Sequence, residues 1–404
     1  MATNFQAPRG FHDVFGQDLR KFRKATDHIR RLLKLYGYEE IITPIIEYAE
    51  LFERSIGETT DIVQKEMFVF EDKKGRLLAL RPEGTAGVVR AFIQNALYAR
   101  KPYTKLFYEG PMFRYERPQA GRYRQFHQIG AEVFGPSHPS ADAEMLKLVS
   151  DIVSALDIQA SLEINSLGCK VCRPNYRQEL IKYLNEIQNA LCSTCVERKD
   201  RNPLRVLDCK VDSCQKAFKG APKMVDFLCE ECSEHYRELK AHLEAMDVSF
   251  RENHKLVRGL DYYTRTVFEA VSEKLGSAII AGGRYDYLVE EFGGPPTPAL
   301  GFAVGIERIS LLLEEPEKSH LLYFVIPFGN VGSYALKVAG LLRSKGYTVE
   351  LSYRRGGLRK HLELANKMSA DFSVIIGENE VKERTVTIKD MRTGEQRKVN
   401  VEDL

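Results

Sequence analysis

The sequence predicts an α+β protein made of an antiparallel sheet flanked by helices, a mostly helical insertion and a C-terminal α/β domain. The sheet is indicated by a series of strand-like segments without regular helical crossovers between them. The insertion is indicated by a change of pattern near residue 169, where charged helical stretches and cysteine pairs begin. The α/β domain is indicated by alternating strand and helix patterns from residue 321 onward. A chain of 404 residues has room for two or three such domains.

The N-terminal elements follow from hydrophobic spacing. Apolar residues at helical intervals predict a helix over 19–36, which Gly37 ends. Residues 38–44 then predict a short strand stopped by proline. Two apolar runs around a polar turn, 67–70 and 77–80, predict a hairpin.

The sheet continues beyond that hairpin. Residues 105–115 and 123–134 predict two long strands that flank a polar turn. After the insertion, strand character returns at 263–270 and 277–281, and a helical pattern follows over 301–313.

The insertion and the C-terminal domain are predicted in the same way. Residues 176–190 and 235–246 predict helices within the insertion, and 316–320 predicts a linker. The small parallel α/β domain after the linker is predicted to contain strands at 321–327, 347–352 and 372–377 and helices at 332–345 and 358–368.

Composition narrows the class of protein. Hydrophobic residues make up 44% and charged residues 28%, as in ordinary globular proteins. No run approaches the ~20 consecutive apolar residues that span a bilayer. The N-terminal residues lack the basic and then apolar pattern of a secretory signal peptide. We therefore expect a cytoplasmic protein with no membrane partner. The net charge is +3, but residues 318–404 hold 15 Lys and Arg against 10 Asp and Glu. A basic terminal domain fits a phosphate-rich partner.

The cysteines are concentrated in the insertion. Three CxxC pairs and one further pair fit metal binding in a cytosolic chain better than disulfides. Eight thiolates could form two closed, structural four-cysteine zinc sites. The alternative is a set of reduced thiols, and the spacing does not reveal which pairs would share a metal. The residues are Cys169, Cys172, Cys192, Cys195, Cys209, Cys214, Cys229 and Cys232.

Two segments carry the chemistry. The chain has no GxxxxGK(S/T) loop and no GxGxxG that opens a helix, so a nucleotide would have to bind on the sheet. Residues 113–128 supply what that requires, namely two strands joined by a tight polar loop and rich in arginine, amide and aromatic groups. Residues 258–263 add an arginine fork suited to phosphate or carboxylate, a carboxylate and two phenols that could grip a small ring.

These segments resemble those of a known family. Residues 113–128 are similar to motif 2 of the class II aminoacyl-tRNA synthetases. The helix and strand that end at Pro44 resemble motif 1 of that family. Residues 299–309 resemble motif 3, a strand that runs into a helix. Residues 258–269, RGLDYYTRTVFE, resemble the histidine-binding signature of histidyl-tRNA synthetases. The resemblance covers almost the whole chain, although the cysteine-rich insertion departs from it.

The resemblance implies an activity. Histidine would be activated by ATP to histidyl-adenylate and then transferred to the 3′ end of tRNA(His), with magnesium bridging the phosphates. Arg258 and Arg114 would be the catalytic residues that hold the α-phosphate from opposite sides. The implied histidine-binding residues are Glu83, Gly84, Thr85, Gln128, Glu132, Tyr262, Tyr263 and Tyr285. The implied ATP-binding residues are Arg114, Glu116, Arg122, Phe126, Arg258 and Arg308.

The family also implies an architecture and partners. Residues 1–168 and 252–316 would form the catalytic domain, 169–251 the insertion and 320–404 the anticodon-binding domain. The proline of motif 1 lies at a dimer interface in the family, which implies a homodimer. The candidate tRNA contacts are Gln119, Arg354, Arg355, Arg359 and Lys360.

Two relatives without synthetase activity are alternatives. The regulatory subunit of ATP phosphoribosyltransferase characteristically lacks the C-terminal domain and the histidine signature, and this chain has both. A synthetase-like sensor of uncharged tRNA typically degrades motifs 2 and 3. This chain keeps all three motif arginines, Arg114, Arg258 and Arg308, and their presence favours an enzyme over a tRNA sensor.

Overall fold

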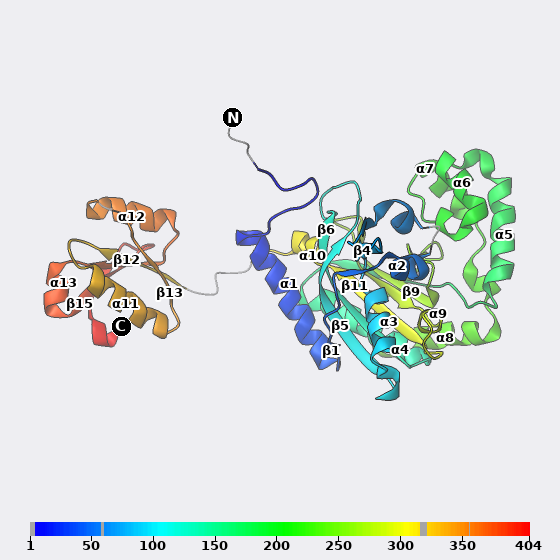
Figure 1. Ribbon diagram of the computed structural model, residues 1–404, viewed down its shortest axis with the longest axis horizontal. Helices are drawn as coiled ribbons and strands as arrows, with labels where there is room; N and C mark the ends of the chain where they lie inside the picture. Colours follow the sequence, from blue (N-terminus) through cyan, green and yellow to red (C-terminus); the bar gives the residue numbers. More distant parts are fainter. Residues whose placement is uncertain (1–4, 58–59, 316–320, 355) are drawn as a thin grey trace. The chain divides into compact units, whose positions relative to one another are not determined.

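In the computed structural model, which describes residues 5–57, 60–315, 321–354 and 356–404, the chain divides into two compact units (Figure 1). Unit 1 is Met1–Glu315 and unit 2 is Pro316–Leu404. The predicted linker at 316–320 lies outside the described residues. No helix among the described residues is both long and apolar enough to cross a membrane.

Unit 1 is built on an eight-stranded sheet. Its strand order is β1-β5-β6-β11-β10-β9-β7-β8. The six inner strands pair antiparallel, and only the two short edge strands, β1 and β8, pair parallel. The predicted α+β class with an antiparallel sheet is therefore confirmed. In sheet order the bounds are Glu39–Glu40, Thr104–Phe113, Gln125–Phe134, Ala299–Gly305, Ser277–Arg284, Thr264–Ser272, Ala160–Ser166 and Arg251–Glu252.

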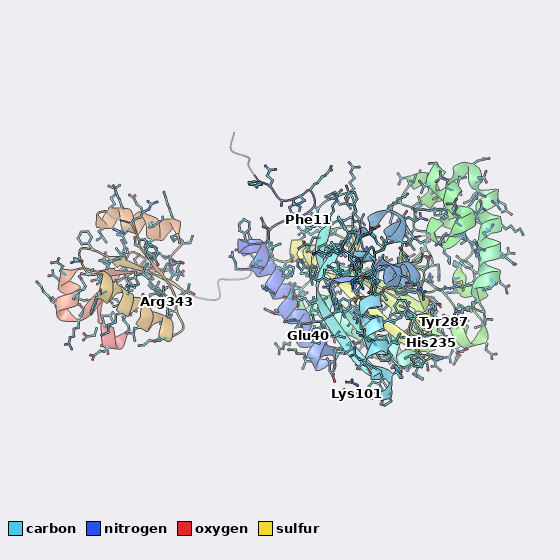
Figure 2. All side chains as sticks on the ribbon, viewed as in Figure 1. Phe11, Glu40, Lys101, His235, Tyr287 and Arg343 are labelled. Atoms are coloured by element: carbon cyan, nitrogen blue, oxygen red, sulfur yellow. The ribbon has the colours of Figure 1, made fainter. Side chains whose placement is uncertain are left out.

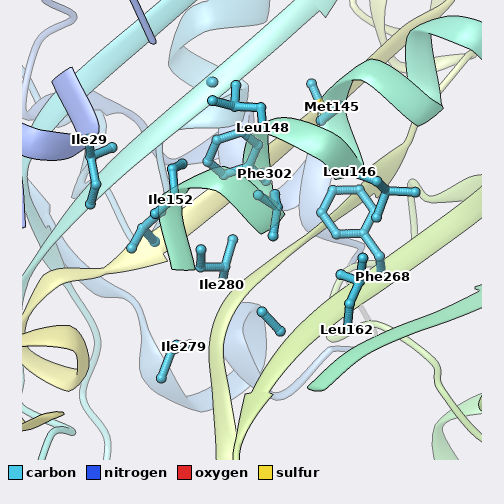
Figure 3. Packing of buried hydrophobic residues seen from close by; sticks show 14 of the residues in the cluster. Ile29, Met145, Leu146, Leu148, Ile152, Leu162, Phe268, Ile279, Ile280 and Phe302 are labelled. Carbon is cyan, nitrogen blue, oxygen red and sulfur yellow. The ribbon is translucent and has the colours of Figure 1, made fainter. Parts of the chain in front are cut away.

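One face of the sheet carries the main hydrophobic core. Successive side chains of a strand point to opposite faces, so alternate residues of the inner strands enter this core. Phe302, Phe268 and Ile280 pack there against Ile29 and Ile152 from the helices (Figure 3). The covering helices are α1 (Gly16–Leu35), α4 (Pro139–Ala155), α8 (Glu230–Ala245) and α10 (Ile306–Leu312).

The opposite face of the sheet is covered by α3 (Thr85–Gln94), α9 (Leu288–Glu291) and the cysteine-rich segment. A separate three-stranded sheet, in the order β2-β4-β3, packs beside it with α2 (Ala49–Ile56). The predicted hairpin is confirmed by antiparallel pairing of β3 (Phe68–Glu71) with β4 (Leu77–Leu80), and β2 is Ile46–Tyr48.

The cysteine-rich segment is mostly helical, as predicted. Its helices are α5 (Arg173–Glu186), α6 (Ser193–Arg201), α7 (Asp212–Ala217) and the start of α8 (Figure 1). Buried residues of these helices share one hydrophobic cluster with Tyr262, Tyr263 and Val267 of the sheet face. The segment is thus packed onto the same sheet that carries the chemistry.

Unit 2 has a five-stranded sheet in the order β13-β12-β14-β15-β16. The first three strands are parallel, as predicted, but two antiparallel strands follow them, so the sheet is mixed. Arg343, labelled in Figure 2, donates from Nη2 to the carbonyl of Val349 at 2.8 Å. The elements are β12 (Leu322–Pro327), α11 (Gly332–Ser344), β13 (Thr348–Leu351), α12 (Leu358–Lys367), β14 (Phe372–Ile376), α13 (Glu378–Glu383), β15 (Thr385–Asp390) and β16 (Gln396–Asn400).

Two local predictions need correction. The strand predicted at 38–44 is reduced to Glu39–Glu40, although Ile41 still donates a backbone hydrogen bond to Phe107 at 2.8 Å. The helix predicted at 301–313 begins only at Ile306. Residues 299–305 form β11 because small and large apolar residues alternate there and the large ones enter the core.

A buried charge cluster joins the helices to the sheet. Arg284 on β10 donates to the Asp142 carboxylate on α4, with 3.2 Å between Nε and Oδ1, and to the carbonyl of Pro136 at 2.9 Å. Burial acts to raise the pKa of Asp142, but the Arg284 guanidinium outweighs it and lowers the pKa. His235 on α8 faces the same carboxylate, with Nε2 3.6 Å from Oδ2, and burial lowers the pKa of this histidine.

We expect Asp142→Ala to lower the free energy of unfolding by about 3 kcal/mol, because the buried Arg284 cation loses its fully buried partner and retains the partly exposed Asp286 carboxylate. Denaturant unfolding followed by circular dichroism measures this. The matched control is Glu50→Ala, which breaks an exposed ion pair with Arg54 and should cause no measurable loss. Equal losses in the two variants would contradict a structural role for the buried pair.

Candidate active site

The alternation of β6 builds the floor of the site. Ile129, Ala131 and Val133 enter the main core, so Phe126, Gln128, Glu132 and Phe134 face the other side of the sheet. Glu132 is 1% exposed and accepts hydrogen bonds from Thr85 Oγ1 at 2.7 Å and from the Tyr285 hydroxyl at 2.5 Å. The pleat of one strand thus presents a buried carboxyl group to the site.

Burial raises the pKa of Glu132 to about 8, even though the hydroxyl donors from Tyr285 and Thr85 act to lower it. Space for this carboxyl group depends on Gly301 on the neighbouring strand. A Cβ atom at Gly301 would lie 1.6 Å from Glu132 Oε2. The site therefore holds a carboxyl group that changes protonation near neutral pH and that packs closely against Gly301.

Glu83 sits at the start of α3 and caps that helix. Its carboxylate accepts from the backbone amides of Thr85 at 2.6 Å and Ala86 at 2.8 Å, groups that have no partner within the helix. Burial raises the pKa of Glu83 despite these donors. A carboxylate has about four acceptor positions, so capacity remains for a further donor such as an amino group. Gly84 stands between Glu83 and Thr85, and a Cβ there would overlap the Tyr108 ring at 2.1 Å.

Three tyrosines stand together beside Glu132. The ring centroids of Tyr262 and Tyr263 are 4.6 Å apart, and those of Tyr262 and Tyr285 are 5.5 Å apart. Burial raises the pKa of all three, so they act as neutral hydroxyl donors and acceptors. Such a group of rings with polar tips fits a small polar ring.

An arginine-lined cavity of about 520 Å³ opens next to this cluster. Arg114 Nε donates to the Pro82 carbonyl at 2.9 Å, and its guanidinium lies 5.5 Å from the centroid of Phe126. Arg308 reaches the carbonyl of Ala278 at 2.6 Å. The lining also includes Glu116, which pairs with Arg122 at 2.9 Å, and Gln128, Arg258 and Glu269. This concentration of cations suits a polyphosphate.

Arg258 is held by two neighbours. It donates from Nη1 to Glu269 on β9, and its guanidinium lies 5.8 Å from the centroid of Tyr263. Burial raises the pKa of Glu269 although Arg258 opposes that shift. The Nε atom of Arg258 and the Oε1 atom of Gln128 are buried without a hydrogen-bond partner among the described residues. Both residues also line the cavity.

The structure gathers the predicted residues into two adjoining groups. The residues expected to bind histidine are buried, except Gln128, which is half-buried and lines the cavity. Every residue expected to bind ATP lines the cavity. The structure thus places the two predicted sets of residues in adjoining groups on one side of β6.

Several site residues were not anticipated from the sequence. Tyr108 is buried against Glu132, with 3.5 Å between its hydroxyl and Oε1, and Glu269 is the partner of Arg258. A lone acidic residue in the apolar strand TVFEAV was the available signal for Glu269. The cysteine-rich segment also contributes to the wall of the cavity through Leu207, Asp208, Lys210 and Gln215, which no local pattern indicates.

The eight cysteines form two groups. In each group the four Sγ atoms lie within 4.8 Å of one another. The measured contacts are 3.6 Å and 3.9 Å in the first group and 3.8 Å in the second. A tetrahedral zinc–thiolate site with bonds of about 2.3 Å implies sulfur separations of about 3.8 Å. Cluster A is Cys169, Cys172, Cys229 and Cys232, and cluster B is Cys192, Cys195, Cys209 and Cys214.

Backbone amides point at these sulfurs. In cluster A, the amide of Cys229 lies 3.1 Å from Cys172 Sγ, and in cluster B the amide of Cys192 lies 3.1 Å from Cys214 Sγ. A backbone hydrogen bond from Cys195 lowers the pKa of the Cys192 thiol to about 7. Donors of this kind favour the thiolate form that binds a metal.

The candidate tRNA contacts are at the surface. Gln119 bridges to Arg122 within the loop between β5 and β6. Arg354 and Lys360 are exposed near the start of α12, and Arg359 pairs with Glu363 at 3.2 Å while remaining 93% exposed. Arg355 lies outside the described residues.

Comparisons with known proteins agree on one family. The family model described as "Histidyl-tRNA synthetase" matches residues 10–309, and the "Anticodon binding domain" model matches residues 323–404. Histidine–tRNA ligase of Aquifex aeolicus strain VF5 is 67% identical over 402 residues, which cover 99% of this chain and 100% of that protein. Histidine–tRNA ligase of Thermodesulfovibrio yellowstonii is 48% identical, with 98% of this chain and 96% of the relative covered.

Solved structures give the same result. The apo histidyl-tRNA synthetase of S. aureus has a TM-score of 0.81 and 33% sequence identity, covering 99% of this chain and 98% of that one. A Bacillus halodurans structure described as an ATP phosphoribosyltransferase regulatory subunit/histidyl-tRNA synthetase has a TM-score of 0.68 at 21% identity, covering 93% of this chain and 99% of that one. The latter likeness shows a common fold.

We expect the pKa of Glu132 to make stability depend on pH. The folded protein holds this proton up to about pH 8, whereas a carboxyl group of ordinary pKa 4.5 releases it earlier in the unfolded chain. The contribution of Glu132 to stability therefore falls as the pH rises from about 4.5 to 8. The melting temperature of the wild type relative to Glu132→Gln should decline across this window. An exposed control, Glu197→Gln, should keep a constant offset. Parallel profiles for wild type and Glu132→Gln would contradict the burial effect.

Proposed function

The chain belongs to the histidyl-tRNA synthetase family and uses ATP to attach histidine to tRNA, and we propose that the two adjoining groups of residues divide this reaction between them. The buried cluster around Glu132 would recognise histidine, and the arginine-lined cavity would bind ATP. The observation that supports this division most directly is the position of Gln128, which lines the cavity and lies on the same face of β6 as Glu132.

Recognition of histidine would rest on buried polar groups that need a partner. The Glu132 carboxyl group can accept a hydrogen bond from the imidazole, and the buried acceptor of Gln128 can take another donor of the substrate. Glu83 would offer the counter-charge for the α-amino group. An apolar analogue would leave these groups unpaired, and such a loss can reject a substrate by roughly 10⁴-fold without editing.

Activation would depend on positioning and charge. The histidine carboxylate attacks the α-phosphorus of ATP, and pyrophosphate leaves. A ribose hydroxyl at the 3′ end of tRNA(His) then attacks the carbonyl carbon of the adenylate, so that the ester forms and AMP leaves. Arg114 and Arg258 would hold the α-phosphate, and Arg308 would bind the outer phosphates or the adenine. Arg258 would exchange part of its contact with Glu269 for the phosphate, a shift that its unpaired Nε atom supports.

The cavity fits a magnesium ion with its nucleotide. Glu116 and Glu269 line it together with Glu163 and Asp208, and carboxylate and phosphate oxygens are the ligands that this ion prefers. When bound, the ion neutralises charge on the phosphates. Glu269 is the residue we expect to hold it, since it stands beside Arg258 at the point where the phosphates would lie.

The two cysteine clusters would each hold a structural zinc ion. The donor set of four thiols, the sulfur separations and the amides aimed at the sulfurs all support this. The clusters also supply the pairing that the sequence left open.

The chain would act as a homodimer in the cytoplasm, where charged tRNA is used. Large apolar side chains stand exposed on the three-stranded sheet and on the segment before it, next to the predicted motif 1. Such a patch is typical of an interface, and the family resemblance supports a second copy as its occupant. On one face of the sheet the residues are Ile46, Tyr48 and Phe70, and Ile42 and Ile45 stand exposed in the segment before it.

The division of labour along the chain follows from these assignments. We assign histidine activation to residues 1–168 and 252–316, with 169–251 as the inserted subdomain. Residues 320–404 would bind the anticodon region of tRNA(His), with Arg354, Arg359 and Lys360 contacting phosphates. Gln119 would approach the acceptor end.

We expect Arg258→Ala to abolish histidine-dependent ATP–pyrophosphate exchange, because the α-phosphate loses a fixed cation. A loss of about 10²–10³ in rate is typical for one such group. The variant should retain a cooperative melting transition. Arg251→Ala removes an exposed arginine of the same unit and serves as the control, with exchange unchanged. Near-normal exchange in Arg258→Ala would refute the assignment.

We expect about two zinc ions per chain by elemental analysis, one for each four-cysteine cluster. A chelator strong enough to strip the metal should lower the melting temperature, and added zinc should restore it. Purified protein with well under one zinc per chain, and with no response to zinc, would show that the clusters are reduced thiols.

A further inference from the structure

We propose that the two zinc clusters serve different substrates: cluster A fixes the histidine-binding tyrosines, and cluster B fixes one wall of the ATP cavity. This inference rests on the proposed zinc sites and goes beyond them, since a structural metal need not influence either substrate. The contacts that link each cluster to the site carry it.

Cluster A is joined directly to the tyrosine segment. Arg173, the residue after Cys172, donates from Nη2 to the backbone carbonyl of Tyr263, and from Nε to the carbonyl of Leu167 at 3.3 Å. One guanidinium thus connects the first turn after the cysteine pair to a residue expected to contact histidine.

The same segment is held on its other side. Leu167 donates its amide to the carbonyl of Arg265 at 2.7 Å, and Arg265 donates its amide to the carbonyl of Gly168 at 2.8 Å. The Arg265 side chain pairs with Glu231, which lies between Cys229 and Cys232. All these contacts therefore come from residues within or adjacent to cluster A.

The backbone at Arg265 requires such support. Its φ angle is +45°, in the left-handed region that residues with a side chain rarely adopt. A conformation of this kind persists only where the surroundings impose it. Gly168, with φ +60°, approaches Cys172 so closely that a Cβ atom would lie 2.7 Å from the cysteine Cβ. A metal that fixes Cys172 therefore also fixes the backbone that keeps Tyr263 in place.

Cluster B is joined to the ATP cavity instead. Cys209 lies between Asp208 and Lys210, and both of these residues line the cavity. Gln215, next to Cys214, also lines it, and its side-chain amide donates to the carbonyl of Cys209. The ammonium group of Lys255, a cavity residue from outside the insertion, lies 3.5 Å from the Gln215 backbone carbonyl. Cluster B thus supports the part of the cavity wall that the insertion contributes.

The two clusters contact different residues directly. Cluster A reaches Tyr263 and Arg265, and none of its four cysteines lines the ATP cavity. Cluster B reaches Asp208, Lys210 and Gln215 on the cavity wall. The Arg258 guanidinium against the Tyr263 ring connects the two sets at second hand. Disturbing one cluster should therefore alter one Michaelis constant more than the other.

The test uses full-length protein and two pairs of variants in ATP–pyrophosphate exchange. Cys169→Ser removes one ligand from cluster A, and Cys209→Ser removes one ligand from cluster B. Arg173→Met and Gln215→Leu keep all eight cysteines but remove the link from each cluster to its site, so they remain informative if a cysteine variant does not fold. Lys182→Met, an exposed position on the same helix as Arg173, is the control and should change neither constant.

We expect Arg173→Met to raise KM for histidine by about tenfold with KM for ATP nearly unchanged, since a hydrogen bond from a charged group contributes about that factor. Gln215→Leu should raise KM for ATP by several-fold and leave KM for histidine unchanged. Cys169→Ser should change the Michaelis constants as Arg173→Met does, and Cys209→Ser should change them as Gln215→Leu does. Each cysteine variant should also lose about one zinc ion per chain.

Elemental analysis and the Michaelis constants decide separate questions. Wild-type protein without zinc would refute the metal sites themselves. Wild-type protein with two zinc ions, but with equal changes of both constants in Arg173→Met and Gln215→Leu, would overturn the division between the clusters. A change of kcat alone, with both KM values unaltered, would overturn it as well.

Discussion

Glu132 keeps a carboxyl group out of water on a strand whose other face carries the apolar core, and the surrounding residues are arranged to tolerate it. A buried carboxylate is costly unless it is protonated or receives hydrogen bonds. Thr85 and Tyr285 supply donors, and Gly301 leaves the room that any side chain would take away. The raised pKa of Glu132 shows that these donors compensate only in part. The carboxyl group therefore retains capacity for one further hydrogen bond, which the imidazole of histidine would supply in the proposed complex.

The hydrogen bonds that Glu132 accepts come from residues that lie far apart in the sequence. Thr85 belongs to the helix that Glu83 caps, and Tyr285 follows the strand end that Arg284 anchors through Asp142. A change in any of these supports would move a donor of Glu132. The buried Arg284–Asp142 pair therefore also supports the position of the Tyr285 hydroxyl that donates to Glu132.

Local pattern indicated the strands on which the candidate site is built, whereas the candidate residues themselves came from the resemblance to motif 2 and to the histidine signature. The alternation of β6 explains why Phe126, Gln128 and Glu132 share one face of the sheet. Local pattern failed where the determining contacts are long-range. Cys169 meets Cys229 across 60 residues, and nothing near either cysteine specifies that pairing. The last strand, Gln396–Asn400, is polar and largely exposed, so it carries no alternation to detect.

The arginines show why composition alone could not assign roles. Arg284 and Arg258 both stand among buried residues close to a carboxylate, yet their surroundings differ. Arg284 is 1% exposed and directs its donors to Asp142, Asp286 and a backbone carbonyl, which leaves it a structural cation. Arg258 lines a cavity and retains an unpaired Nε atom, with Glu269 as its carboxylate partner. A cation that is already satisfied stabilises the fold, whereas one with a donor left over next to open space can bind a phosphate. This distinction depends on the geometry of the neighbours and not on the residue type.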